Sequence, residues 1–90
     1  MASYKVLIKA SAAKEIETVG QKRDRQRIVS RILALAEEPR PVGCEKLAGV
    51  GDRYRLRVGR YRVVYSVADA ELLVVVVRVA HRKDVYRQGT

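Results

Sequence analysis

The sequence predicts an α+β fold, in which a helical hairpin packs on a mainly antiparallel four-stranded sheet in the order β-α-α-β-β-β. Two observations lead to this prediction. Apolar residues recur at helical spacing in the first half of the chain, whereas apolar and polar residues alternate from Tyr54 onward. A loop over residues 39–52, which contains both prolines, separates the two patterns. Helices followed by a run of short strands are typical of α+β domains, and the 90 residues form one such domain, residues 1–90.

The first element is a short strand that leads into a short helix. Alternation over residues 4–9 indicates the strand. Ser11 is a suitable N-cap residue, because its hydroxyl can accept a hydrogen bond from the first free backbone N–H groups of a helix. We therefore expect this helix over residues 12–19, with Gly20 as its stop.

A longer helix is expected over residues 22–37. Its apolar stripe consists of Ile28, Ile32 and Leu35. Charged residues, Arg23 and Arg27 among them, fall on the solvent-facing side. The helix ends before Pro39, because proline lacks the N–H group that a continuing helix needs.

The C-terminal half predicts three strands. Residues 54–58 and 61–67 alternate, and Gly59-Arg60 between them is suited to a tight hairpin turn. Residues 72–79 are apolar on both faces, which is typical of a central strand. A short basic tail, residues 81–90, follows.

The charge of the chain predicts a polyanionic partner. There are 19 Lys and Arg against 10 Asp and Glu, which gives a net charge of +9. Such a charge on a small surface attracts polyanions and speeds their capture. Nucleic acid, an anionic membrane and an acidic protein are the candidate partners, and the plainer alternative is a soluble protein that is merely basic.

Cysteine content and hydropathy predict a cytoplasmic protein without a membrane partner. Cys44 is the only cysteine, so an intrachain disulfide is impossible. The N-terminus lacks a signal-peptide pattern. The longest apolar run, residues 72–77, is far shorter than the roughly 20 residues that span a bilayer. With one His and one Cys, we expect no dedicated metal site and no cofactor.

Three arginines of the hairpin form the candidate functional site. Side chains alternate across a strand, so Arg55 and Arg57 share the face opposite the apolar residues of their strand. Arg62 has the same orientation on the next strand, and antiparallel pairing can bring all three together. Cations this close repel one another unless an anion joins them, which favours a phosphate site over the ordinary alternative of a solvated face.

Two residues of the basic tail are further candidates. His81 is the only side chain with an unperturbed pKa near neutrality, and Arg82 adjoins it, although a lone histidine is more often structural than catalytic. Tyr86 lies among basic residues, where it can stack on a base or cover the edge of the domain.

An ordered set of short motifs resembles the RelE-type toxins of bacterial and archaeal toxin–antitoxin systems. The motifs are SAAKE at residues 11–15, the break at Pro39, KLAG at 46–49, YRLR at 54–57, RYRVVY at 60–65 and VAHRKDVYR at 79–87. This resemblance covers nearly the whole chain and implies the RelE-like fold.

The resemblance also implies a function. RelE-type toxins are ribosome-dependent mRNA endonucleases that cleave in the ribosomal A site, and an antitoxin holds them inactive. The substrate's own 2′-hydroxyl attacks the phosphate, and no metal is needed. The partners implied here are the ribosome, mRNA and a cognate antitoxin with an acidic or amphipathic segment. The family's active positions fall on Arg55, Arg57, Arg62, Arg82 and Tyr86.

One departure from the family affects the proton transfers. The best-known members carry lysines at the positions of Arg55 and Arg57, and arginine stays charged in proteins. Our hypothesis is that both arginines act only through their charge. His81, or Tyr86 with a pKa lowered by nearby cations, then supplies the general base.

Two other functions stay open at this point. ParE-type toxins have the same fold but poison DNA gyrase without cleaving RNA. A non-catalytic RNA-binding or ribosome-associated module would also use every basic residue named above, with Tyr86 as a stacking platform only.

Overall fold

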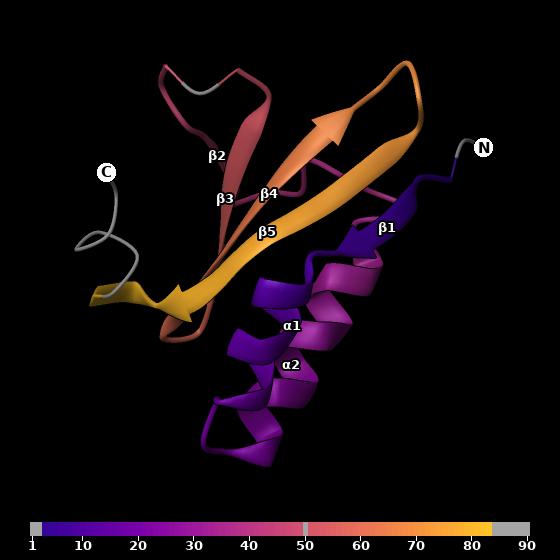
Figure 1. The fold of residues 1–90 in the computed structure, drawn as a ribbon. Coiled ribbons are helices and arrows are strands. Elements are labelled where there is room, and N and C mark those ends of the chain that lie inside the picture. Colours follow the sequence, from indigo (N-terminus) through magenta and orange to yellow (C-terminus); the bar gives the residue numbers. More distant parts are fainter. Residues whose placement is uncertain (1–2, 50, 84–90) are drawn as a thin grey trace.

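The computed structural model describes residues 3–49 and 51–83, and it has two helices on one side of a five-stranded sheet (Figure 1). The elements in chain order are β1 (Lys5–Ile8), α1 (Ala10–Glu17), α2 (Lys22–Ala34), β2 (Glu45–Lys46), β3 (Arg53–Val58), β4 (Tyr61–Ala68) and β5 (Leu73–His81). The predicted fold class and the helical hairpin are confirmed.

The sheet has the strand order β1-β5-β4-β3-β2. Strand β1 pairs with β5 in parallel, and the other three pairings are antiparallel, as expected for a mainly antiparallel sheet. The prediction of four strands was wrong by one. The additional strand, β2, is only two residues long and pairs Glu45 with Arg55 and Lys46 with Tyr54. A strand this short has no alternation that the sequence could reveal.

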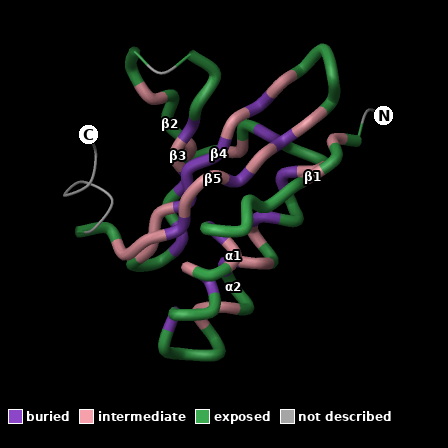
Figure 2. The backbone as a smooth tube through the Cα atoms, viewed as in Figure 1, coloured by how far each residue is buried: buried purple, intermediate pink, exposed green. Residues whose placement is uncertain are grey.

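The core lies between the sheet and the helical hairpin. Buried residues appear on the inner sides of the helices and along the central strands (Figure 2). The largest fully buried side chains are Tyr65, Ile28, Ile32, Leu35, Leu56, Val63, Val74, Val76 and Val79. The apolar stripe predicted for the second helix therefore packs on the apolar face predicted for the hairpin.

The helix boundaries differ from the predicted ones for local reasons. Helix α1 starts at Ala10, and its N-cap is Lys9 rather than Ser11. The N–H of Lys9 still bonds to β5, while its carbonyl already accepts the first helical bond from Ala13. Strand β1 thus runs directly into the helix, which leaves Ser11 inside the first turn.

Helix α2 ends at Ala34, three residues before the predicted end. Its last turn continues with bonds between residues three apart, including Leu35 N–H to Ile32 O at 3.0 Å. None of the helices in residues 3–49 and 51–83 is long and apolar enough to cross a membrane.

A β-bulge in β5 decides which of its side chains face the helices. On β4, Val64 pairs with Arg78, whereas the next residue, Tyr65, pairs with Val76. Val77 is therefore an extra residue that shifts the alternation of β5 by one. Since paired residues share a face, Arg78 lies with Val64 on the face away from the helices. Unbroken alternation from Val76 would have turned Arg78 toward the core.

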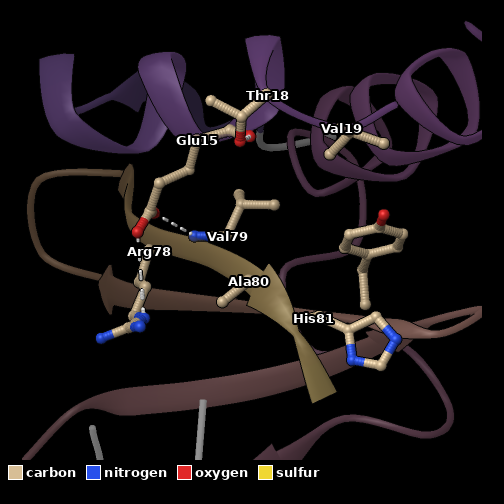
Figure 3. A pocket seen from close by; sticks show the side chains of 8 residues that line it. Glu15, Thr18, Val19, Arg78, Val79, Ala80 and His81 are labelled. Atoms are coloured by element: carbon tan, nitrogen blue, oxygen red, sulfur yellow. Dashed lines mark hydrogen bonds and ion pairs between the residues drawn. The ribbon is translucent and has the colours of Figure 1, made fainter. Parts of the chain in front are cut away.

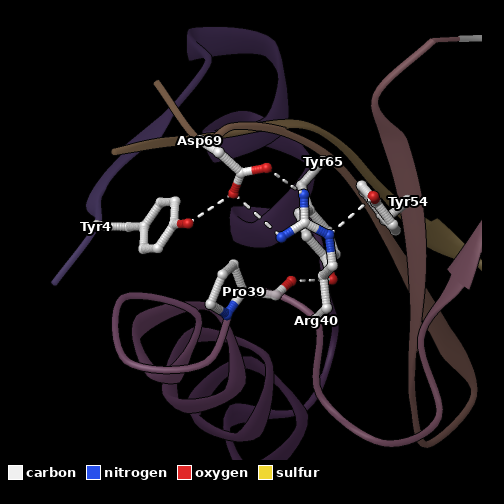
Figure 4. A network of polar contacts seen from close by, with 6 residues as sticks. All are labelled: Tyr4, Pro39, Arg40, Tyr54, Tyr65 and Asp69. Carbon is white, nitrogen blue, oxygen red and sulfur yellow. Dashed lines mark hydrogen bonds and ion pairs between the residues drawn. The ribbon is translucent and has the colours of Figure 1, made fainter. Parts of the chain in front are cut away.

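A polar network joins four separate segments of the chain (Figure 4). Asp69, in the β4–β5 turn, accepts a hydrogen bond from the Tyr4 hydroxyl at 2.6 Å. It also accepts two from Arg40, at 3.1 and 2.8 Å, and Arg40 Nε donates to the Tyr54 hydroxyl at 2.9 Å. The Arg40 guanidinium, followed by the Tyr4 hydroxyl, lowers the pKa of the Asp69 carboxyl. The network fixes the loop after α2 against the sheet.

The same loop is held from inside the core. The fully buried Tyr65 donates a hydrogen bond through its hydroxyl to the carbonyl of Pro39 at 2.8 Å. Burial raises the pKa of the Tyr65 hydroxyl well above its ordinary value, so it stays a donor. Its ring stacks on Tyr54, with the ring centres 5.8 Å apart. These contacts position the segment that leads to β2.

Candidate functional site

The three arginines predicted on the hairpin meet on the outer face of the sheet. On β3, Tyr54 and Val58 are buried against the helices, so Arg55 and Arg57 project to the other side. The turn at Gly59 sets the register in which Arg57 pairs directly with Arg62 of β4. The local alternation therefore places these side chains where the sequence predicted.

The arginines line a cleft with a volume of about 510 Å³. The chain segment before β3 forms its other wall, and the lining residues are Gly43, Cys44, Glu45, Arg55, Arg57 and Arg62. Glu45 is the acidic residue among them. Its Oε1 accepts a hydrogen bond from Arg55 Nη2 at 2.6 Å, and the Arg55 side chain is only 18% exposed. The Arg55 guanidinium, with a further contribution from the charge of Arg62, lowers the pKa of the Glu45 carboxyl.

Positive charge in this cleft exceeds negative charge. Three arginines and one glutamate leave a formal charge of +2 among the lining side chains. Arg57 and Arg62 stand directly opposite each other, an arrangement that destabilises a sheet. Arg62 Nη1 is buried and has no hydrogen-bond partner among the described residues. A buried donor without an acceptor is costly, so a bound anion would relieve both effects.

His81 lies on the opposite face of the sheet from the arginines. It pairs with Tyr61, whose ring packs against the core and meets the imidazole edge-on at 5.6 Å between ring centres. Figure 3 shows His81 at one end of a different cleft, of about 320 Å³, between β5 and α1. Glu15 and Thr18 line the helical side of this cleft. The sheet therefore separates His81 from Arg55, despite its place in the basic tail.

Of the two other predicted residues, the structure describes only Arg82. Arg82 follows β5 directly, and its backbone N–H donates to the carbonyl of Arg60 in the hairpin turn at 2.8 Å. Its side chain is exposed and does not line the arginine cleft in the described part of the chain. Tyr86 lies outside the described residues.

Sequence reasoning missed two residues of this face. Glu45 escaped notice because β2 has no pattern of its own. Arg78 escaped notice because the Val77 bulge, which turns it outward, depends on pairing with β4. Glu15 of α1 holds this part of β5: its Oε1 accepts a hydrogen bond from the backbone N–H of Val79 at 2.7 Å, and its Oε2 lies 4.0 Å from Arg78 Nε. The sequence did contain one signal for Arg78, because it is the lone charged residue in the apolar run of β5.

Comparison of the sequence with known proteins finds toxins of toxin–antitoxin systems. Residues 6–86 match the family described as ParE toxin of type II toxin-antitoxin system, parDE. Toxin RelG of Mycobacterium tuberculosis is 34% identical over 80 residues, which cover 79% of this chain and 92% of that toxin.

Solved structures agree with these sequence matches. The archaeal RelE–RelB complex from Pyrococcus horikoshii has a TM-score of 0.79 and 30% identity, covering 89% of this chain and 96% of that chain. The isolated RelE toxin of E. coli has a TM-score of 0.75 and 28% identity, with coverage of 97% and 95%. With a family match over nearly its whole length, the chain belongs to the RelE/ParE family and is a toxin of a type II toxin–antitoxin system.

Proposed function

We propose that this toxin is a metal-independent endoribonuclease that cleaves mRNA in the ribosomal A site. The observation that supports the proposal is the arginine cleft, in which Arg55, Arg57 and Arg62 surround a space of about 510 Å³ and Arg62 keeps a buried donor unsatisfied. The similarity to RelE toxins supports it as well.

The cleft suits the charge that develops during RNA cleavage. Attack by the 2′-oxygen on the adjacent phosphorus forms a pentavalent species with additional negative charge. Arginine presents a planar fork of donors that can bind two phosphate oxygens at once. Donors fixed before the reaction stabilise this charge without reorganisation, which is often the largest catalytic contribution. Arg62 Nη1 is such a donor, because no acceptor in the described residues competes for it.

The reaction also moves two protons. The 2′-hydroxyl loses one as the cyclic 2′,3′-phosphate forms, and the departing 5′-oxygen gains one. Glu45 is the carboxylate of the cleft and is ionised at neutral pH, so it can accept the first proton. The bond with Arg55, which lowers the pKa of Glu45, also makes it a weak base, so this bond must loosen as the proton is transferred. We therefore assign the general base to Glu45 rather than His81, which faces the helices. Water or a tail residue such as Tyr86 supplies the second proton.

A cognate antitoxin completes the proposal. Several similar structures are complexes of a RelE toxin with its RelB antitoxin. The net charge of +9 favours an antitoxin with an acidic or amphipathic segment that lies across the basic face. Such a complex weakens as salt rises, at least in its electrostatic part.

A second function is favoured by the family match, whose description names ParE. In that case the protein poisons DNA gyrase, and the arginine face binds its target without chemistry. The two functions predict different products, because only the endonuclease generates new RNA ends.

The test adds purified toxin to bacterial ribosomes programmed with a defined mRNA and maps new 5′ ends. Naked mRNA, brief EDTA treatment after programming and the Arg62→Gln protein are the controls. Ribosome-dependent cleavage in the A-site codon that survives EDTA and disappears in Arg62→Gln supports the proposal. A folded protein that produces no ends but inhibits gyrase supercoiling would transfer the assignment to the second function.

A further inference from the structure

We infer that a second cleft, between the start of α2 and the β3–β4 turn, binds the phosphodiester backbone of RNA. This inference rests on the proposed function, because it assumes an RNA target. The cleft has a volume of about 360 Å³ and is lined by Gln21, Arg23, Asp24, Arg27, Gly59 and Arg60.

The arginines of this cleft come from two distant parts of the chain. Arg23 and Arg27 are one helical turn apart on α2, and Arg60 belongs to the β3–β4 turn. All three are exposed, and none forms an ion pair with another described residue. Asp24 is the single acidic lining residue, so three positive and one negative side chain give a formal charge of +2.

Arg27 of α2 lies against the β3–β4 turn at Gly59. The φ of +61° at Gly59 is a conformation that glycine adopts without strain. A Cβ atom at this position would stand 3.6 Å from Arg27 Nη1, so the guanidinium lies directly over the turn. The turn therefore places Arg60 and Arg27 at one opening, where a phosphate can contact both.

The start of α2 adds backbone donors to this cleft. Gln21 makes no side-chain capping bond, and the first helical bond runs from Arg25 N–H to Gln21 O at 3.1 Å. The N–H groups of Lys22, Arg23 and Asp24 therefore precede the helical bonding pattern. Backbone donors together with guanidinium groups form an arrangement that suits phosphate oxygens.

The second cleft shares no lining residue with the arginine cleft, but the chain links the two through the β3–β4 turn. The carbonyl of Arg60 accepts the N–H of Arg82, which brings the start of the basic tail to the same turn. Arg60, in the turn, and Arg62, in β4, are two residues apart, which is at most about 7 Å along the chain. One RNA chain with its reacting phosphate at Arg62 can thus continue to Arg60 and Arg27. A folded RNA beside the substrate could present the same phosphate chemistry.

The experiment compares two variants with the same net charge. Arg23→Gln/Arg27→Gln and the control Lys5→Gln/Lys14→Gln each reduce the charge from +9 to +7. Lys5 and Lys14 are exposed residues of β1 and α1 and line neither cleft. Fluorescence anisotropy measures the affinity for a short unstructured RNA and for an RNA hairpin over a salt series. Circular dichroism and thermal melting verify the fold of each variant.

The expected result is a change specific to the cleft. The arginine variant loses several-fold in affinity, and the slope of log Kd against log salt for single-stranded RNA falls by about 1.4, or about 0.7 for each lost phosphate contact. The control variant keeps a slope close to the wild type. A larger effect on the unstructured RNA identifies the substrate strand as the ligand, and a larger effect on the hairpin identifies folded RNA.

Equal behaviour of the two variants would overturn the inference, since only net charge would then matter. An unchanged RNA affinity and salt slope in the arginine variant would also overturn it. The anisotropy measurement requires no RNA cleavage. Its result therefore tests this inference independently of the endonuclease assignment. A toxin that cuts no RNA on ribosomes still shows whether Arg23 and Arg27 contact phosphates.

Discussion

Replacement of Arg62 by methionine should raise the stability of this protein and strongly reduce the proposed RNA cleavage. Methionine keeps most of the side-chain length and removes the charge and the donors. Arg62 Nη1 is buried without a partner in the described residues, and Arg62 stands opposite Arg57. The unsatisfied donor and the repulsion between the two arginines both destabilise the free protein. Removing them should therefore increase the free energy of unfolding.

The magnitude follows from these two contributions. An unsatisfied buried donor costs about 1–3 kcal/mol, and a pair of like charges directly opposite in a sheet costs about 0.2–1 kcal/mol. Arg62 is only partly buried, so we take the lower end and expect a gain of about 1 kcal/mol in the free energy of unfolding. For a domain of this size that corresponds to a rise in Tm of roughly 4–8 °C. Loss of one preorganised donor should reduce cleavage by about 10²-fold or more.

Thermal melting and the programmed-ribosome cleavage assay measure the two effects. Arg53→Met is the matched control, because Arg53 lies on the same face of β3 but is exposed, pairs with Ser66 and has no buried unsatisfied donor. We expect no gain in Tm for the control. A lower Tm for Arg62→Met, or cleavage at the wild-type rate, would refute the reasoning that Arg62 is kept for an anion at the expense of stability.

Three further predictions concern the cleft and the loop beside it. Glu45→Gln should lower the single-turnover rate of cleavage by about 10²–10⁴-fold with ribosome binding retained, and a rate within a few-fold of wild type would remove Glu45 as general base. Tyr65→Phe removes the donor to the Pro39 carbonyl and should lower the free energy of unfolding in urea by about 1–2 kcal/mol, whereas an unchanged value would mean that the bond adds nothing. The pKa of Asp69 is lower in the folded state than its ordinary value of about 3.9, so its bond with Arg40 stabilises the fold above that pH and is lost as pH falls through the folded pKa. Below about pH 4 the Tm of the wild type should therefore fall more steeply than that of Asp69→Asn, and parallel curves would contradict this linkage.

The sequence by itself determined the helical hairpin, the apolar face of the sheet and the convergence of Arg55, Arg57 and Arg62. These features depend on alternation within one strand and on a tight turn that joins adjacent strands. Both are local, because the backbone of an extended segment turns successive side chains to opposite faces whatever the partner strand is. The +9 charge likewise needed no fold to indicate a polyanionic partner.

Only the tertiary structure decided which further residues join the arginine face. Glu45 comes to Arg55 through a two-residue strand, and the Val77 bulge turns Arg78 outward while it turns His81 toward the helices. Without the bulge the two would exchange faces, and His81 would lie on the arginine face, where a general base is required. A bulge forms where a strand must fit its neighbour on β4, so the cause lies in the pairing of distant segments rather than in the residues of β5 alone.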